Sequence, residues 1–366
     1  MPTDEVDAVK ATQKLHDTGQ SLWIDDITRD MLDSGTLAKY ISELSVTGLT
    51  SNPTIFDRAV TKSDKYDDEI RRLLKSGLKG EPLFFELALQ DLSRAADLFL
   101  PVHQQTATVD GWVSLEVSPL LAYDTDATIA EAKRLYKKAG KPNLFIKIPG
   151  TKEGLPAIEE AIFSGVTVNV TLLFSAAQYT AAADAYMKGL ERRVEAGLSP
   201  DVRSVASVFI SRWDKAVMDK VPDALRDKLG IAVGKGCYKA YRDVLNSDRW
   251  QRLESLGARP QRLLFASTST KDPKAPDTMY VQAFAAPNTV NTMPDETLLA
   301  FGDHGTVEGV LSPDGGDSAA VLAEYEKAGF DVAALAQKLQ DDGAKSFVQS
   351  WQDLLKAIET KSLALA

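Results

Sequence analysis

Eight short apolar or alternating runs, separated by longer segments of helical periodicity, constrain the fold of this chain more than any other feature. The candidate strands are residues 21–26, 46–51, 111–118, 143–150, 165–174, 204–211, 262–268 and 288–293. Strands that alternate with helices indicate a parallel sheet, because each crossover needs a connection about the length of a helix. Eight such units predict an α/β fold that closes into a (β/α)8 TIM barrel, which typically takes about 250 residues.

The segments between and around these strands predict helices. The apolar periodicity and capping signals are clearest in residues 82–100, 126–140 and 175–197. The chain has 366 residues, so it is longer than a bare barrel. The additional residues predict an N-terminal helix, a helical insert at 212–256 and a C-terminal helical tail at 317–362. Because no repeat, linker or break in composition divides the sequence, we expect a single domain over residues 1–366.

The composition argues against several classes of partner. A net charge of −10 disfavours nucleic acid and anionic membranes, so an anionic substrate would need a local patch of positive charge. No apolar run approaches the roughly 20 residues of a membrane-spanning helix. The N-terminal segment has no signal-peptide core. Cys237 is the single cysteine, so no internal disulfide is possible, and we expect a cytoplasmic protein.

The sequence gives no indication of a metal or a cofactor. Its three histidines, His16, His103 and His304, have no partner at the spacing of metal ligands. There is also no glycine-rich phosphate loop and no nucleotide-binding fingerprint. We therefore expect chemistry that is performed by side chains alone.

A lysine lies in the middle of the predicted strand "LFIKIPG". An ammonium group is uncommon in a central strand of a parallel sheet. Because alternate residues of a strand face opposite sides, Ile146 and Ile148 share one face, and Phe145 and Lys147 share the other. The aliphatic face suits the outer layer of helices. We therefore expect Lys147 to point into the barrel, near the carboxyl end of its strand.

The same alternation predicts polar inward faces on five strands. The residues expected to face inward are Trp23 and Asp25; Ser114, Glu116 and Ser118; Phe145 and Lys147; Thr167, Asn169 and Thr171; and Ser207, Phe209 and Ser211. Barrel interiors are usually filled by branched apolar side chains, and barrel active sites lie at the carboxyl ends of the strands. The polar interior therefore predicts an active site at that end.

This set of side chains suits Schiff-base chemistry. Burial disfavours the charged form of an amine, and a neutral Lys147 would be a nucleophile toward a carbonyl carbon. The resulting iminium accepts the electrons of a breaking carbon–carbon bond. Such a reaction needs carboxyl groups to move protons, and Asp25 and Glu116 are inward carboxylates of the right type. Thr171, Asn169 and Asn52 could hold water and sugar hydroxyls.

Structural interpretations stay open for several of these residues. Lys147 could be half of a structural ion pair with Glu116. Asn52 could simply cap the helix that Pro53 begins. Thr171 could fill space in the barrel. In the C-terminal helix, Phe347 and Trp351 could be exposed aromatics that cover the barrel or mediate a dimer, and the sequence does not specify an oligomeric state.

Five motifs resemble those of the transaldolase family, and in particular its longer bacterial form. They are "GLTSNPTIF" (48–56), "VSLEVSP" (113–119), "LFIKIPGTKEG" (144–154), "VNVTLLFS" (168–175) and "NTVNTMP" (288–294). The resemblance runs from about residue 10 to the C-terminus, with the motifs in the family's order. It implies a cofactor-free enzyme of the pentose phosphate pathway, which moves a dihydroxyacetone unit from a ketose phosphate to an aldose phosphate.

The resemblance also implies a role for each matching residue. Lys147 would form the imine, and Asp25 would be the acid/base of carbon–carbon cleavage. Glu116 and Thr171 would handle the catalytic water. Residues that would hold the substrate are Asn52, Asn169 and Ser211.

The phosphate site departs from the family pattern. Arg212 follows Ser211 directly, and Lys271 in "ASTSTKDP" stands where an arginine is usual. Alternation puts Arg212 on the outward face if its strand extends that far. A lysine can bind phosphate as a point charge, without the bidentate fork of arginine. The alternatives to a transaldolase are a related Schiff-base aldolase that cleaves without transfer and a non-catalytic barrel that binds sugar phosphates.

Overall fold

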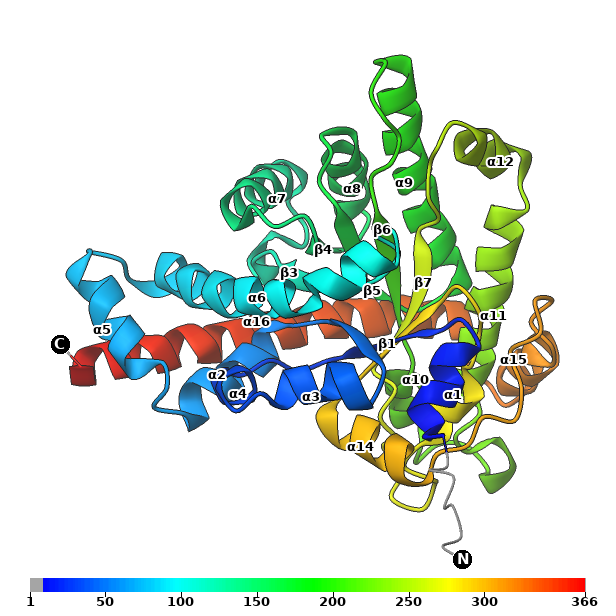
Figure 1. Ribbon diagram of the computed structural model, residues 1–366. Coiled ribbons are helices and arrows are strands. Elements are labelled where there is room, and N and C mark those ends of the chain that lie inside the picture. The colour runs from blue at the N-terminus through cyan, green and yellow to red at the C-terminus, as the bar shows by residue number, and fades with distance from the viewer. Residues whose placement is uncertain (1–8, 366) are drawn as a thin grey trace, which may run out of the picture.

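The barrel is present in the computed structural model, which describes residues 9–365 (Figure 1). Within these residues the strands pair in parallel and in sequence order, and β8 pairs with β1 to close the ring. The strands are β1 (Ser21–Ile24), β2 (Val46–Leu49), β3 (Trp112–Glu116), β4 (Leu144–Pro149), β5 (Val168–Leu173), β6 (Ser204–Phe209), β7 (Arg262–Ala266) and β8 (Val290–Met293). The predicted (β/α)8 TIM barrel is confirmed, and each of the eight predicted strands is longer than the observed one.

Helices surround the ring and account for the residues beyond a bare barrel. Before β4 they are α1 (Ala11–Asp17), α2 (Arg29–Asp33), α3 (Thr36–Glu43), α4 (Pro53–Lys62), α5 (Asp67–Lys75), α6 (Gly80–Gln105), the 3-10 turn η1 (Pro119–Leu121) and α7 (Thr125–Ala139). From β4 to β7 they are α8 (Gly154–Phe163), α9 (Ala176–Glu195), α10 (Ser211–Val217), η2 (Asp223–Leu225), α11 (Leu229–Leu245) and α12 (Asp248–Ser255). After β7 they are α13 (Met279–Ala283), α14 (Asp295–His304), α15 (Ser318–Lys327) and α16 (Val332–Leu365).

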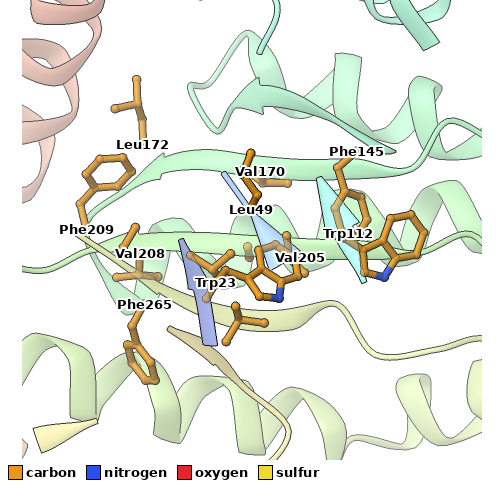
Figure 2. Packing of buried hydrophobic residues seen from close by; sticks show 14 of the residues in the cluster. Trp23, Leu49, Trp112, Phe145, Val170, Leu172, Val205, Val208, Phe209 and Phe265 are labelled. Atoms are coloured by element: carbon orange, nitrogen blue, oxygen red, sulfur yellow. The ribbon is translucent and has the colours of Figure 1, made fainter. Parts of the chain in front are cut away.

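Aromatic side chains fill the amino-terminal half of the barrel. Trp112 stacks on Phe145 with ring centroids 4.1 Å apart, and Trp23 lies 6.2 Å from the same ring (Figure 2). The indole of Trp23 needs the space above Gly48 on β2, since a Cβ there would lie 2.5 Å from the indole nitrogen. This layer closes the floor beneath the polar residues.

A hydrogen-bonded polar layer lies next along the strands. The Asn169 amide nitrogen donates to Ser114 Oγ at 3.1 Å, and Ser207 Oγ donates to the Asn169 oxygen at 2.7 Å. Lys147 pairs in register with Glu116 on one side and with Asn169 on the other. The inward orientation predicted from alternation therefore places the lysine and the glutamate side by side.

The long C-terminal helix α16 packs against the barrel and contacts α4, α5, α6 and β5 (Figure 1). The sequence analysis treated Phe347 and Trp351 as exposed aromatics, but in the structure both are buried, with 4% and 1% of their surface accessible. Trp351 packs edge-on against Phe84 of α6, with centroids 4.9 Å apart. Of the two interpretations of these aromatics, the structure shows the first, in which they cover the barrel. No helix among the described residues combines the length and apolarity needed to span a membrane.

Candidate active site

A pocket of about 420 Å³ opens at the carboxyl ends of the strands. Its size lies within the range usual for small-molecule sites. Its walls include six of the nine residues singled out from the sequence, namely Asp25, Asn52, Lys147, Thr171, Arg212 and Lys271. The structure therefore has a pocket at the carboxyl ends of the strands, where the sequence predicts the active site.

Lys147 reaches the pocket from β4 and is only 4% accessible. Its ammonium nitrogen donates to the Ser51 carbonyl oxygen at 3.1 Å and lies 3.2 Å from Glu116 Oε2. The second distance is that of an ion pair, but the two groups are not aligned as a hydrogen bond. The amine is thus enclosed by protein and held beside one carboxylate.

Glu116 lies beside this amine, and Thr171 lines the same pocket as Lys147. Both carboxylate oxygens of Glu116 and the hydroxyl oxygen of Thr171 are buried. Among the described residues, none of these three oxygens has a hydrogen-bond partner. Burial raises the pKa of Glu116, while the charge of Lys147 opposes this shift. Buried polar atoms are normally satisfied, so free ones at a pocket are suited to water or substrate.

A break in the register of β5 accompanies Thr171. The pairing with β6 shifts between Val170 and Leu173, and Leu172 adopts a left-handed backbone with φ 59°. Such strained bulges often lie next to active sites. The bulge frees the Leu172 carbonyl from the sheet, and the side-chain amide of Gln340 in α16 donates to it at 2.9 Å.

Asp25 directly follows β1, which lies across the barrel from β5. Its carboxylate accepts a hydrogen bond of 2.8 Å from Thr50 Oγ1, which in turn contacts the hydroxyl of Thr292 at 2.7 Å. Burial raises the pKa of Asp25, while Lys147 and the Thr50 hydroxyl act in the opposite direction. Burial also raises the pKa of the adjacent Asp26, to about 6. Carboxyl groups with raised pKa values in a pocket are candidate acid/base groups.

Of the predicted substrate-binding residues Asn52, Asn169 and Ser211, only Asn52 lines the pocket. Asn52 lines the pocket and is also the N-cap of α4, since its side-chain oxygen accepts from the Ile55 amide at 3.1 Å. The structural and functional interpretations of Asn52 are thus compatible. Asn169 and Ser211 do not line the pocket. Asn169 is engaged in the polar layer, and Ser211 Oγ contacts Ser267 Oγ at 2.9 Å.

Arg212 lines the pocket because β6 ends earlier than predicted. The strand was expected to reach residue 211, which would have turned Arg212 outward. Instead β6 ends at Phe209, Ile210 leaves the extended conformation, and α10 begins at Ser211. The strand alternation therefore no longer applies, and the guanidinium lies over the Phe209 ring, 5.0 Å from its centroid.

Positive charges gather at the mouth of the pocket. Arg58 of α4, Arg212 and Lys271 all line it, and within residues 9–365 none of them forms an ion pair. Burial lowers the pKa of Arg212 and that of Lys271, and neighbouring cations lower the latter further. Unpaired cations that repel one another in an acidic protein form a site suited to an anion.

The pocket wall also includes residues that were not among the nine predicted site residues. Examples are Ser207, Phe209, Ser267, Ser269 and Phe347. Ser207 and Phe209 share the inward face already identified on their strand, so their position was a usable signal. Phe347 comes from α16, and no local pattern indicates which residues of a distant helix reach the barrel.

Comparison with known proteins agrees with this architecture. Residues 22–358 match the family described as Transaldolase/Fructose-6-phosphate aldolase. A transaldolase of Parafrankia sp. (strain EAN1pec) is 44% identical over 358 residues, which cover 95% of this chain and 97% of that protein. A transaldolase of Thermobifida fusca (strain YX) is 45% identical, with 94% and 96% covered. Transaldolase 2 of Streptomyces coelicolor is 43% identical, with 97% and 98% covered. The chain belongs to the transaldolase/fructose-6-phosphate aldolase family.

Proposed function

We propose that this protein is a transaldolase, a transferase of the pentose phosphate pathway. It moves a dihydroxyacetone unit from a ketose phosphate, sedoheptulose 7-phosphate or fructose 6-phosphate, to an aldose phosphate. The observation that carries the proposal is the enclosed Lys147 amine, 3.2 Å from Glu116 and in one pocket with Asp25 and unpaired cations. Full-length relatives named transaldolase support the same conclusion.

The first step is imine formation on Lys147. The amine attacks the ketone carbon of the donor, and the carbonyl oxygen leaves as water once it has received protons. Glu116 and Thr171 are placed to pass these protons, because the Glu116 carboxylate lies 3.2 Å from the amine and Thr171 lines the same pocket as Lys147. The raised pKa of Glu116 favours a carboxyl group that can donate as well as accept.

The second step breaks the bond between C3 and C4 of the donor. Asp25 accepts the proton of the C4 hydroxyl, the C4 oxygen becomes a carbonyl, and the bonding electrons move into the iminium to form an enamine. The aldose phosphate leaves. The enamine carbon then attacks the aldehyde of the acceptor, and Asp25 returns its proton to the new hydroxyl. Water hydrolyses the final imine and restores Lys147.

Substrate binding is divided between amides, hydroxyls and cations. The amide nitrogen of Asn52 faces a sugar hydroxyl, since its oxygen is used by the helix cap. Asn169 acts through Ser207, which lines the pocket and donates to it. Ser211 acts in the same way through Ser267. Arg212 and Lys271 bind the phosphate group.

Reductive trapping tests the proposal directly. Borohydride added in the presence of fructose 6-phosphate should reduce the imine and add a dihydroxyacetone-derived mass to Lys147, located by peptide mass spectrometry. A coupled assay with erythrose 4-phosphate as acceptor should detect transfer. An adduct on another lysine, or none, would refute the role of Lys147. An adduct with dihydroxyacetone release but no transfer would instead identify the related aldolase activity.

We also propose that the barrel and its added helices form one domain in the cytoplasm. The contacts of α16 with α4, α5 and α6 support a single unit, because they join the two ends of the chain. The lone cysteine, Cys237, is buried and unpaired, as expected in a reducing compartment.

A further inference from the structure

A phenyl ring from the C-terminal helix forms part of the active-site wall. Phe347 of α16 lines the pocket and is 4% accessible. Its ring centroid lies 5.9 Å from the Lys147 nitrogen and 5.6 Å from the Arg212 guanidinium carbon. Arg212 also lies over the Phe209 ring (labelled in Figure 2), so rings from two different elements contact the guanidinium.

The helix that carries Phe347 is fixed firmly over the barrel. Gln340 donates to the carbonyl oxygens of Gly150 and Leu172, at the ends of β4 and β5, at 3.0 and 2.9 Å. At Gly343 an added Cβ would lie 3.0 Å from the Leu172 side chain and 3.1 Å from Arg212, so the helix backbone lies close to both side chains. These contacts hold the ring of Phe347 in one position.

A Schiff-base transferase must protect its enamine from water. If water protonates the enamine carbon, an iminium ion and hydroxide form, and the carbon that would attack an acceptor is no longer nucleophilic. The hydroxide then adds to the iminium carbon, and the carbon–nitrogen bond breaks as a proton moves from oxygen to nitrogen, which frees Lys147 and releases dihydroxyacetone. The transfer reaction is thereby lost to simple cleavage. Exclusion of water by apolar walls is a general way to prevent such side reactions.

We propose that Phe347 is a specificity-determining residue, which keeps water from the enamine on Lys147 and so favours transfer over release of free dihydroxyacetone. The inference rests on the proposed function. It assigns to α16 a part in the reaction itself, beyond covering the barrel. The ring is the apolar group that α16 contributes to the pocket wall, and its distance to the lysine nitrogen places it next to any imine formed there.

The test is the ratio of dihydroxyacetone release to transfer, measured in the full-length enzyme with fructose 6-phosphate, with and without erythrose 4-phosphate. Phe347→Ala should raise this ratio about ten-fold, and Phe347→Leu, which keeps more apolar volume, should raise it by a smaller factor. Leu354→Ala is the matched control. Leu354 is fully buried on the same helix but does not line the pocket, so its truncation loosens packing without removing the wall.

Each outcome bears on a separate statement. A graded rise for the two Phe347 variants, with the Leu354 variant near the native ratio, supports the inference. If Phe347→Ala fails to fold, the Phe347→Leu variant alone decides, because an unchanged ratio there overturns the proposal. An equal rise for Leu354→Ala also overturns it, since helix docking would then explain the effect. Absence of the Lys147 adduct in the native enzyme would instead refute the proposed function.

Discussion

Asp25 lines the pocket and Glu116 lies beside Lys147, and the surroundings of these two buried carboxyl groups suit them to different steps. Asp25 receives a hydrogen bond from Thr50, which favours its ionised form. Glu116 has no such donor and relies on the nearby charge of Lys147. Paired titratable groups in different environments often divide acid and base roles between them. Asp25 therefore suits proton abstraction from a hydroxyl, and Glu116 suits proton exchange around the amine.

Asp25→Asn should separate imine formation from bond cleavage. The amide keeps the size of the side chain but cannot accept the proton of the C4 hydroxyl. Loss of a general base typically costs a factor of about 10²–10⁴ in rate, so turnover should fall within that range. The borohydride adduct on Lys147 should still form, now with the mass of the whole ketose phosphate. Turnover close to the native rate would reject the assigned role of Asp25.

The hydroxyl of Thr50 should control the pH dependence of the enzyme. Asp25 must be ionised to act as a base, so kcat/KM falls as the pH drops through its pKa. Burial already raises this pKa above the ordinary value of 3.8, and the Thr50 hydrogen bond lowers it. Thr50→Val removes the donor, so the pKa should rise and the acidic limb of the profile should move to higher pH.

Thr50→Ser is the matched control for this prediction, because serine keeps the hydroxyl that donates to Asp25. Its acidic limb should stay at the native position. The measurement is kcat/KM for fructose 6-phosphate across the acidic range. A limb that moves to lower pH in Thr50→Val, or moves equally in both variants, would contradict the argument.

At the scale of elements, the sequence predicted which strand side chains face into the barrel, because this follows from the two-residue period of an extended strand. Alternation placed Lys147, Glu116 and Thr171 inward, and the structure has Lys147 beside Glu116, with Thr171 in the wall of the same pocket as Lys147. The same rule failed for Arg212, because it applies only while the backbone stays extended and β6 ends at Phe209. The sequence suggested that Phe347 could cover the barrel, but not that it lines the pocket, because that place depends on how a distant helix packs rather than on local periodicity.

One buried amide contributes to the docking of α16. Gln340 satisfies two backbone carbonyls at the carboxyl ends of β4 and β5. Gln340→Met keeps the shape and removes both donors, which leaves buried acceptors unpaired at a cost of about 1–3 kcal/mol each. The free energy of unfolding, measured by denaturant titration, should fall by at least about 1 kcal/mol. The rate of adduct formation on Lys147 should fall as well, because the Leu172 bulge next to Thr171 loses its anchor.

A second glutamine on the same helix provides the control. Gln349 is exposed, and its amide donates to Asp353 at 3.0 Å on the helix surface. Gln349→Met should change the free energy of unfolding by less than about 0.5 kcal/mol and leave adduct formation unchanged. If Gln340→Met behaved in the same way, the two carbonyl contacts would have no part in holding the helix.

At the scale of the whole molecule, the charge distribution opposes the proposed substrates. The chain carries a net charge of −10, which repels sugar phosphates at long range. The mouth of the pocket nevertheless gathers Arg58, Arg212 and Lys271 without ion-pair partners among residues 9–365. Affinity for phosphate must therefore come from this local set. The long-range repulsion weakens binding little, because salt screens it within about 10 Å.

Lys271→Ala separates two effects on phosphate binding, namely the direct contact of the Lys271 side chain and the overall charge of the protein. Lysine binds phosphate through a charge-assisted contact worth about 1.5–3 kcal/mol, so KM for fructose 6-phosphate should rise about ten-fold or more. KM for unphosphorylated fructose should hardly change, because that sugar makes no such contact. Lys274→Ala removes the same charge from an exposed residue that lies close in sequence but outside the pocket wall. It should leave both constants near the native values. Equal effects of the two variants, or equal effects on the two sugars, would show that Lys271 changes only the overall field and does not bind the phosphate group.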